Sequence, residues 1–125
     1  MSNLGNLILI RGVSGFSKGE AFKLKQGQSI VIGRSRKCDF SLRRSVAYLR
    51  LTPQERESQK AFQAVSRQHC RISFIHKNTL EIEDSSRHGT YINGKRIRRV
   101  IITDIDRKNY RIILGVIEEL ALESS

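Results

Sequence analysis

The sequence has little of what membrane, secreted and disordered proteins are rich in. Its 125 residues contain no apolar run near the roughly 20 residues that a membrane helix needs. The N-terminal residues lack the basic start and the small-residue cleavage site of a signal peptide. A single proline, nine glycines and 38% hydrophobic residues are typical of a folded chain and exclude a disordered or collagen-like one. We therefore expect a single domain over residues 1–125, with no membrane span.

Cysteine is also scarce, since the chain has only Cys38 and Cys70. Two cysteines form at most one disulfide, and with no sign of secretion we expect reduced thiols and a cytoplasmic protein. No Cys-x-x-Cys or His-x-x-x-His spacing is present, and the adjacent His69 and Cys70 would point to opposite faces of a strand. We therefore expect buried thiols and neither a metal ion nor another cofactor.

Acidic residues are few, because 12 Asp and Glu stand against 23 Lys and Arg, a net charge of +11. Such a surface attracts anions, whether nucleic acid, anionic lipid or phosphorylated protein. The basic residues are spread over several expected loops, and no helix-turn-helix or RNA-reading aromatic motif accompanies them. A basic nucleic-acid-binding domain remains an alternative to a phosphoprotein-binding one.

Short apolar runs and apolar–polar alternations dominate the chain and predict many short strands. Asn93 and Gly94 form the dipeptide favoured in two-residue hairpin turns. Roughly ten strands separated by turn residues predict an all-β antiparallel sandwich. The expected strands cover residues 7–10, 22–25, 29–32, 70–74, 79–83, 91–97 with the hairpin turn inside, 100–102, 110–114 and 119–122.

One segment departs from the strand pattern. The run Thr-Pro-Gln-Glu that starts at Thr52 combines an N-cap threonine, a proline at the first helical position and a glutamate three residues after the cap. These signals predict a helix near residues 53–63. Because the segment is polar almost all round, with only Ala61 and Phe62 to anchor it, we expect this helix on the surface.

Three polar clusters fall on expected loops. Gly33 and Arg34 follow a buried strand, a Ser-Arg-Gln-His run at 66–69 precedes another strand, and residues 84–94 link two later strands. Each cluster places Arg, Ser or His at a strand end, which is where a sandwich presents its functional loops.

In this order, the Gly-Arg, Ser-x-x-His and Gly-Thr-x-x-Asn-Gly motifs resemble those of the forkhead-associated (FHA) family. The resemblance runs from about Leu7 to Leu122 and includes Cys-Asp-Phe-Ser-Leu at 38–42 and Arg-Ile-Ile-Leu-Gly at 111–115. It implies an FHA-like (SMAD/FHA) β-sandwich of about eleven strands. It also implies a phosphothreonine-dependent protein–protein recognition module of Ser/Thr kinase signalling, which is not an enzyme and binds phosphopeptide through loops at one end.

The resemblance assigns phosphate or peptide binding to Arg34, Ser66, Arg67, Arg87 and His88, and structural support of the site to Gly33, His69 and Gly89. Arg34 would make charge-assisted hydrogen bonds to the phosphate, each contributing about 1.5 to 3 kcal/mol. Ser66 would donate its hydroxyl to a phosphate oxygen. His69 would brace the binding loops.

The chain departs from the family pattern in its last loop. His88 stands where most family members have an asparagine that donates to and accepts from the peptide backbone. A neutral histidine supplies only one donor and one acceptor. Arg87 adds a forked donor within reach of the phosphate. If the altered site no longer needs phosphate, the protein would be a phospho-independent scaffold, which is a second alternative.

A second departure is an insertion at about residues 43–64, since the 32 positions from Arg34 to Ser66 are more than we expect for this family. Because the insertion connects two expected phosphate-binding residues, it should lie near the site and form a lid or a docking surface. Its basic residues and those at 95–99 would form a rim that favours acidic residues beside the phosphothreonine.

The pair Ser66 and His69 also invites a hydrolase hypothesis. A serine nucleophile needs a base, an orienting acid and an oxyanion hole, and no Gly-x-Ser-x-Gly elbow is present. We therefore expect no enzymatic activity.

Overall fold

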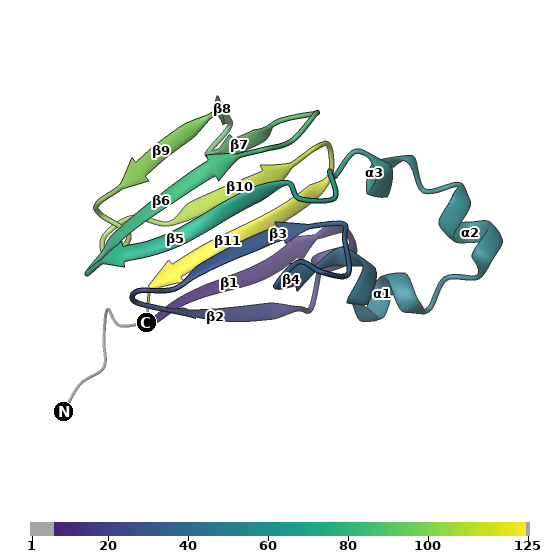
Figure 1. Ribbon diagram of the computed structural model, residues 1–125, viewed down its shortest axis with the longest axis horizontal. Helices are drawn as coiled ribbons and strands as arrows, with labels where there is room; N and C mark the ends of the chain where they lie inside the picture. Colours follow the sequence, from purple (N-terminus) through teal and green to yellow (C-terminus); the bar gives the residue numbers. More distant parts are fainter. Residues whose placement is uncertain (1–6, 125) are drawn as a thin grey trace.

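Two packed β-sheets with short helices at one end form the part of the chain that the computed structural model describes, residues 7–124 (Figure 1). One sheet has six strands in the order β2-β1-β11-β10-β7-β8, and the other has five in the order β4-β3-β5-β6-β9. The strands are β1 (Leu7–Ser14), β2 (Ala21–Lys25), β3 (Ser29–Gly33), β4 (Phe40–Ser41), β5 (Cys70–His76), β6 (Thr79–Asp84), β7 (Thr90–Ile92), β8 (Lys95–Ile97), β9 (Arg99–Ile102), β10 (Tyr110–Leu114) and β11 (Glu118–Ser124). This all-β sandwich confirms the expected fold class.

Apart from the two-residue strand β4, which the sequence pattern does not predict, the strands form where the sequence predicts them, because their apolar residues recur with the period of a pleated sheet. Neighbouring strands pair antiparallel, as β1 does with β2 and β11, except for the short parallel pair β3 and β4. The predicted hairpin turn connects β7 and β8, with φ of 48° at Asn93 and 86° at Gly94. Left-handed backbone at both central residues is the geometry that favours the Asn-Gly dipeptide.

The apolar faces of the two sheets meet in one core. Both cysteines lie in it as free thiols, as expected, and burial raises the pKa of the Cys70 thiol. Each fully buried aliphatic side chain contributes about 1.5 to 3 kcal/mol of transfer free energy. The largest aliphatic side chains with almost no exposed area are Ile8, Ile10, Leu24, Ile32, Leu42, Ile72, Leu80, Ile82, Ile112 and Leu114.

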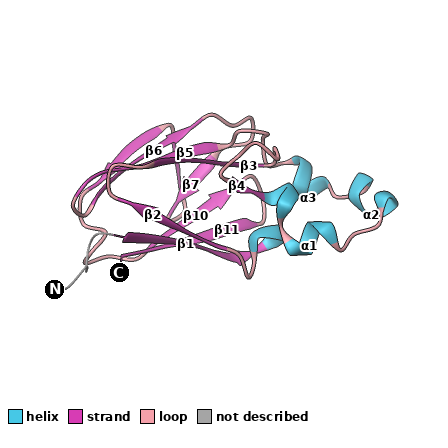
Figure 2. Cartoon of the chain, turned by 60° about the horizontal axis from the view of Figure 1, so that its bottom comes forward, coloured by secondary structure: helices cyan, strands magenta, loops and turns pink. Residues whose placement is uncertain are grey.

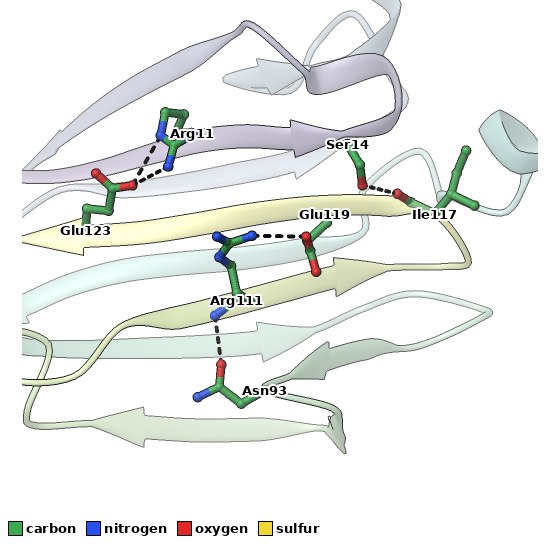
Figure 3. A network of polar contacts seen from close by, with 7 residues as sticks. All are labelled: Arg11, Ser14, Asn93, Arg111, Ile117, Glu119 and Glu123. Carbon is green, nitrogen blue, oxygen red and sulfur yellow. Dashed lines mark hydrogen bonds and ion pairs between the residues drawn. The ribbon is translucent and has the colours of Figure 1, made fainter.

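Two arginines on the outer face of the six-stranded sheet have glutamate partners on β11 (Figure 3). Arg11 pairs with Glu123 at 2.6 Å, and Arg111 pairs with Glu119 at 3.1 Å. Exposed pairs of this kind stabilise the fold by at most about 1 kcal/mol each. They do neutralise Arg11 and Arg111, which distinguishes these two arginines from Arg34 at the helical end of the sandwich.

The predicted helix near 53–63 is divided in two in the structure, and another short helix precedes it. The helices are α1 (Val46–Leu49), α2 (Pro53–Glu57) and α3 (Lys60–Gln63), with 3-10 turns η1 (Gly15–Ser17) and η2 (Leu42–Arg44) beside them. The predicted start is confirmed, because Thr52 Oγ1 accepts from the Glu55 amide and Glu55 Oε1 accepts from the Thr52 amide. The helix stops at Ser58, whose hydroxyl donates to the Glu55 carbonyl at 3.0 Å in competition with the helical bonds.

The inserted segment (residues 43–64) is fastened to the core by aromatic side chains, including Phe62, one of the two anchors that the sequence offers. Phe62 is fully buried and stacks on Tyr48, with ring centroids 4.4 Å apart and planes at 22°. Phe16 packs edge-on against both rings at 6.0 and 5.3 Å. Only α2 among the three helices has no buried residue. The helices gather at the end of the sandwich where β1 finishes and β11 begins (Figures 1 and 2).

A buried carboxylate secures the same end. Glu118, only 1% exposed, accepts hydrogen bonds from the amides of Phe16 and Ser17 and from the Ser17 hydroxyl at 2.6 to 2.9 Å. The η1 turn is therefore held against the start of β11. None of the helices within residues 7–124 is long and apolar enough to cross a membrane.

Candidate functional site

Four connecting segments meet at the helical end of the sandwich, and we call this surface the loop end. They are the β3–β4 loop (34–39), the segment before β5 (65–69), the β6–β7 loop (85–89) and the β10–β11 turn (115–117). The amide of Arg34 donates to the Ser66 carbonyl at 3.0 Å, and the amide of Gly115 donates to the Gly89 carbonyl at 3.2 Å. The Ser85 amide donates to the His69 carbonyl at 2.9 Å, so backbone hydrogen bonds hold the three polar clusters of the sequence side by side.

Gly33 sets the distance between the first two segments. A Cβ atom at this position would lie 2.3 Å from the carbonyl oxygen of Arg67. The strand end and the segment 65–69 can approach each other this closely only because Gly33 has no side chain. This close approach is the physical reason for a glycine before Arg34.

The Arg34 side chain is half-buried and fixed at two points. Its Nε donates to the Val65 carbonyl at 2.8 Å, and its guanidinium carbon lies 5.9 Å from the centre of the Phe62 ring. Its terminal NH₂ groups have no hydrogen-bond partner among residues 7–124. Burial, and then the positive charges of Arg43 and Arg67, lower the pKa of Arg34, although an arginine remains charged at any physiological pH.

Ser66 connects the segment before β5 to the β6–β7 loop. Its Oγ accepts a hydrogen bond from the Arg87 amide at 3.0 Å, and its own amide donates to Nδ1 of His69 at 3.0 Å. Because the oxygen already accepts from a backbone amide, the hydroxyl proton is free to be donated elsewhere. The serine is therefore positioned as a hydrogen-bond donor.

His69 is fully buried and joins the two loops and the sheet. Its Nδ1 accepts from the Ser66 amide, which assigns the proton to Nε2, and Nε2 donates to the Gly89 carbonyl at 2.8 Å. Its backbone amide donates to the Ile32 carbonyl, and its carbonyl accepts from the Ser85 amide. The neutral ring thus holds both loops in register, which is consistent with the supporting function that the resemblance implies.

The stability of the protein should depend on the protonation of His69. Burial lowers the pKa of His69 from its ordinary value of 6.5, so the unfolded chain takes up this proton before the folded one. Stability from this residue is complete above pH 6.5 and falls as the pH decreases below it. We expect the melting temperature of the wild type to fall by a few degrees between pH 7 and pH 5.

A His69→Gln variant should show a flatter dependence of melting temperature on pH over the same range, whatever its absolute stability. The exposed His76 and His88 are present in both proteins and serve as an internal control. If the melting temperatures of the wild type and the variant depend equally on pH, His69 is not the residue that makes stability fall at low pH.

The β6–β7 loop is built around Asp84. Its Oδ1 accepts from the amide and the hydroxyl of Ser86 and from the hydroxyl of Thr90 at 2.6 to 3.1 Å. Burial works to raise the pKa of Asp84, but these hydrogen bonds outweigh it and lower the pKa. Gly89, with φ of 101°, takes a left-handed conformation, and its amide donates to the Ser86 hydroxyl. The loop has a defined shape that does not depend on a ligand.

The structure brings Arg34, Ser66 and Arg67 together and places the remaining predicted residues on the adjoining loop. Arg67, Arg87 and His88 are exposed, and their side chains make no hydrogen bond or ion pair to any residue in 7–124. Within the same residues, no group of three or more His, Cys, Asp and Glu is arranged to hold a metal ion. The loop end therefore presents forked and hydroxyl donors without carboxylate partners, a composition suited to an anion.

Sequence reasoning placed the inserted segment near the site but did not identify the aromatic contacts that bring Arg43 to it. Arg43 lies with its guanidinium carbon 5.9 Å from the Phe62 ring and 6.0 Å from the Tyr48 ring, beside Arg34. Neither a strand alternation nor a motif marks these residues in the sequence, because the segment folds into three short helices. The charge-rich start of the insertion was the one available signal.

Comparison with known families decides the identity of the fold. The family model for the FHA domain matches residues 30–109, well over half of the chain. The chain belongs to the FHA domain family. FHA domains are protein–protein interaction modules known for phosphopeptide-dependent binding. No curated protein matches the sequence.

Solved FHA structures share this fold. The FHA domain of CT664 from Chlamydia trachomatis is 21% identical, with 95% of this chain and 99% of that chain covered and a TM-score of 0.68. An FHA domain of a hypothetical protein from Arabidopsis thaliana is 22% identical, covers 95% and 86%, and has a TM-score of 0.68. The FHA domain of FhaA, solved in complex with the intracellular domain of Rv3910, is 21% identical, covers 91% and 98%, and has a TM-score of 0.59. The FHA-like sandwich expected from the sequence is thereby confirmed.

Proposed function

We propose that this FHA domain binds phosphothreonine-containing proteins at its loop end, without catalysing a reaction. The observation that carries the proposal is the convergence of free donors from Arg34 and Ser66 beside Arg67, with no carboxylate paired to them. An FHA domain from work on phosphothreonine-dependent FHA interactions resembles this chain with a TM-score of 0.62 and 19% identity. This likeness supports the proposal at the level of the fold.

Each donor has a defined function in the proposal. The bond from Arg34 Nε to the Val65 carbonyl fixes the side chain, so its two terminal nitrogens project as a fork toward two phosphate oxygens. Ser66 donates its hydroxyl proton to a phosphate oxygen while it accepts from the Arg87 amide. Arg67 adds charge from the exposed side. A phosphate with a charge of about −1.5 to −2 matches this set of donors.

The β6–β7 loop contacts the phosphate or the flanking peptide through Arg87 and His88. His88 replaces the usual asparagine. Its neutral ring offers one N–H donor and one nitrogen acceptor to the peptide backbone, in place of the amide NH₂ and carbonyl oxygen of asparagine. Gly33, His69 and Gly89 hold the loops in place by close packing and hydrogen bonds.

The partner carries acidic residues beside the phosphothreonine. A groove of about 670 Å³ adjoins the β6–β7 loop and is lined by Asp84, Ser85, Ser86, Arg96, Ile97 and Arg98, with the Asp84 Oδ1 already occupied by hydrogen bonds within the loop. Two arginines along a groove next to a phosphate site favour acidic side chains of a bound peptide. Arg99 is excluded from this function, because it pairs with Glu81.

We further infer that the whole of residues 1–125 forms one domain that acts in the cytoplasm, on proteins phosphorylated by a Ser/Thr kinase. The free, buried thiols of Cys38 and Cys70 suit a reducing compartment.

Calorimetry with a degenerate phosphothreonine peptide library tests the proposal. We expect micromolar affinity, about 8 kcal/mol, for the phosphothreonine library, weaker binding of a phosphoserine version and no binding of an unphosphorylated one. Equal affinity for the unphosphorylated library would support a phospho-independent scaffold. A shift of labelled DNA or RNA at low salt, with no preference for phosphopeptide, would support a nucleic-acid binder.

A further inference from the structure

Two arginines from different segments rest on the same aromatic ring. The guanidinium carbons of Arg34, in the β3–β4 loop, and Arg43, in η2 at the start of the inserted segment, each lie 5.9 Å from the centre of the Phe62 ring. Tyr48 stacks on Phe62 and lies 6.0 Å from Arg43. The inserted segment thus places a second guanidinium on the ring that supports Arg34, close enough for its charge to act on Arg34.

Arg43 also has an unsatisfied donor. Its Nε is buried and has no hydrogen-bond partner within residues 7–124. A phosphate oxygen cannot reach an atom with so little exposed area, so the terminal nitrogens of Arg43 are the donors available to a ligand. They are not buried, and they make no hydrogen bond to any residue in 7–124.

The surroundings of Arg43 differ from those of the paired arginines elsewhere in the fold. Arg11 and Arg111 have glutamate partners on the sheet, and Arg44, next to Arg43 in the chain, donates to the carbonyls of Cys38 and Asp39. Arg43 has no acidic partner within the described residues, and its charge lowers the pKa of Arg34. Like charges are held together here without a counterion from the chain.

We propose that Arg43 binds the phosphate of the ligand together with Arg34, so that the inserted segment forms a wall of the anion site. This inference rests on the proposed function and assigns it a further binding residue. Phe62 and Tyr48 position Arg43, as the Val65 carbonyl and Phe62 position Arg34. Two guanidinium groups match the two negative charges of a phosphate dianion.

Calorimetry of an Arg43→Gln variant tests the inference, with a phosphothreonine peptide whose other residues are all uncharged. Such a peptide confines any electrostatic loss to the phosphate, and the buffer must contain no phosphate or sulfate. We expect Arg43→Gln to weaken binding by about tenfold or more, as for the loss of a charge-assisted hydrogen bond. Arg43→Lys should recover only part of the loss, because lysine retains the charge but not the forked donors.

Arg50→Gln is the matched control. Arg50 lies in the same inserted segment and is exposed, and its side chain has no hydrogen bond or ion pair to any residue in 7–124. This variant removes the same charge, and we expect it to change the affinity by less than about twofold, as for a screened surface charge.

Three outcomes would count against the inference. Equal affinities for Arg43→Gln and Arg50→Gln, with a wild type that still requires phosphate, would overturn it and leave the proposed function intact. A wild type that binds phosphorylated and unphosphorylated peptide equally would overturn both. If Arg43→Gln melts below the assay temperature, Arg43→Lys decides, and wild-type affinity in that variant overturns the inference.

Discussion

Replacement of Arg34 with alanine is expected to reduce the affinity for a phosphothreonine peptide by at least about a hundredfold. The variant removes two charge-assisted donors from the phosphate, each contributing about 1.5 to 3 kcal/mol. The stability of the fold should change much less, because the side chain is only half-buried and its one protein hydrogen bond goes to the Val65 carbonyl. Calorimetry and thermal melting measure the two effects separately.

Two further variants show whether the fork or only the charge of Arg34 matters. Arg34→Lys retains the charge but places all its donors on one nitrogen, which cannot reproduce both the Nε bond to the Val65 carbonyl and the fork of terminal nitrogens, so an intermediate loss is expected. Arg36→Ala removes an exposed arginine two residues along the same loop and should change the affinity by less than about threefold. Wild-type affinity in Arg34→Ala would be incompatible with a phosphate site at the loop end.

Replacement of Phe62 with alanine is expected to lower the free energy of unfolding by about 3 to 5 kcal/mol. The ring is fully buried, stacks on Tyr48 and receives the edge of Phe16, so its loss leaves a cavity between the inserted segment and the sandwich. Urea unfolding followed by circular dichroism measures the change. A loss below about 1 kcal/mol would show that the segment is not anchored in the core.

Phe62→Leu separates packing from ligand positioning. Leucine refills most of the volume, so the variant should remain folded at 25 °C, with a smaller loss of stability than Phe62→Ala. It lacks the aromatic face on which Arg34 and Arg43 rest, and phosphopeptide affinity should fall by several-fold. Gln54→Ala, an exposed substitution in α2, is the control for both measurements. Unchanged phosphopeptide affinity in Phe62→Leu would show that the aromatic ring does not contribute to binding.

The anchoring of Phe62 also changes how the inserted segment can be studied. A deletion of the whole segment would remove a core residue and would test stability instead of binding. Only α2, which has no buried residue, can be shortened without opening the core.

The strands and the hairpin could be predicted because their signals are local. Apolar residues alternate or run together within each strand, and the Asn93-Gly94 turn has a backbone that few other dipeptides adopt. The start of α2 was equally readable, since the capping box of Thr52 and Glu55 lies within four residues.

The interior of the site could not be predicted, because its contacts connect residues far apart in the chain. The Phe16–Phe62 contact and the bond from His69 to the Gly89 carbonyl depend on how the loops and the inserted segment fold back on the sheets. Glu118 gave no signal either, because a glutamate at a strand end normally lies in solvent, whereas here two backbone amides and a hydroxyl stabilise it inside the fold.

Recognition of phosphothreonine by the loop end is tested most directly by titrating ¹⁵N-labelled protein with one phosphothreonine peptide and following the amide chemical shifts. We expect the large shifts to fall within residues 33–37, 65–69 and 85–89, and to be absent with the unphosphorylated peptide. Equal shifts with both peptides, or shifts centred on Arg11 and Arg111 of the outer sheet face, would contradict a phosphothreonine site at the loop end.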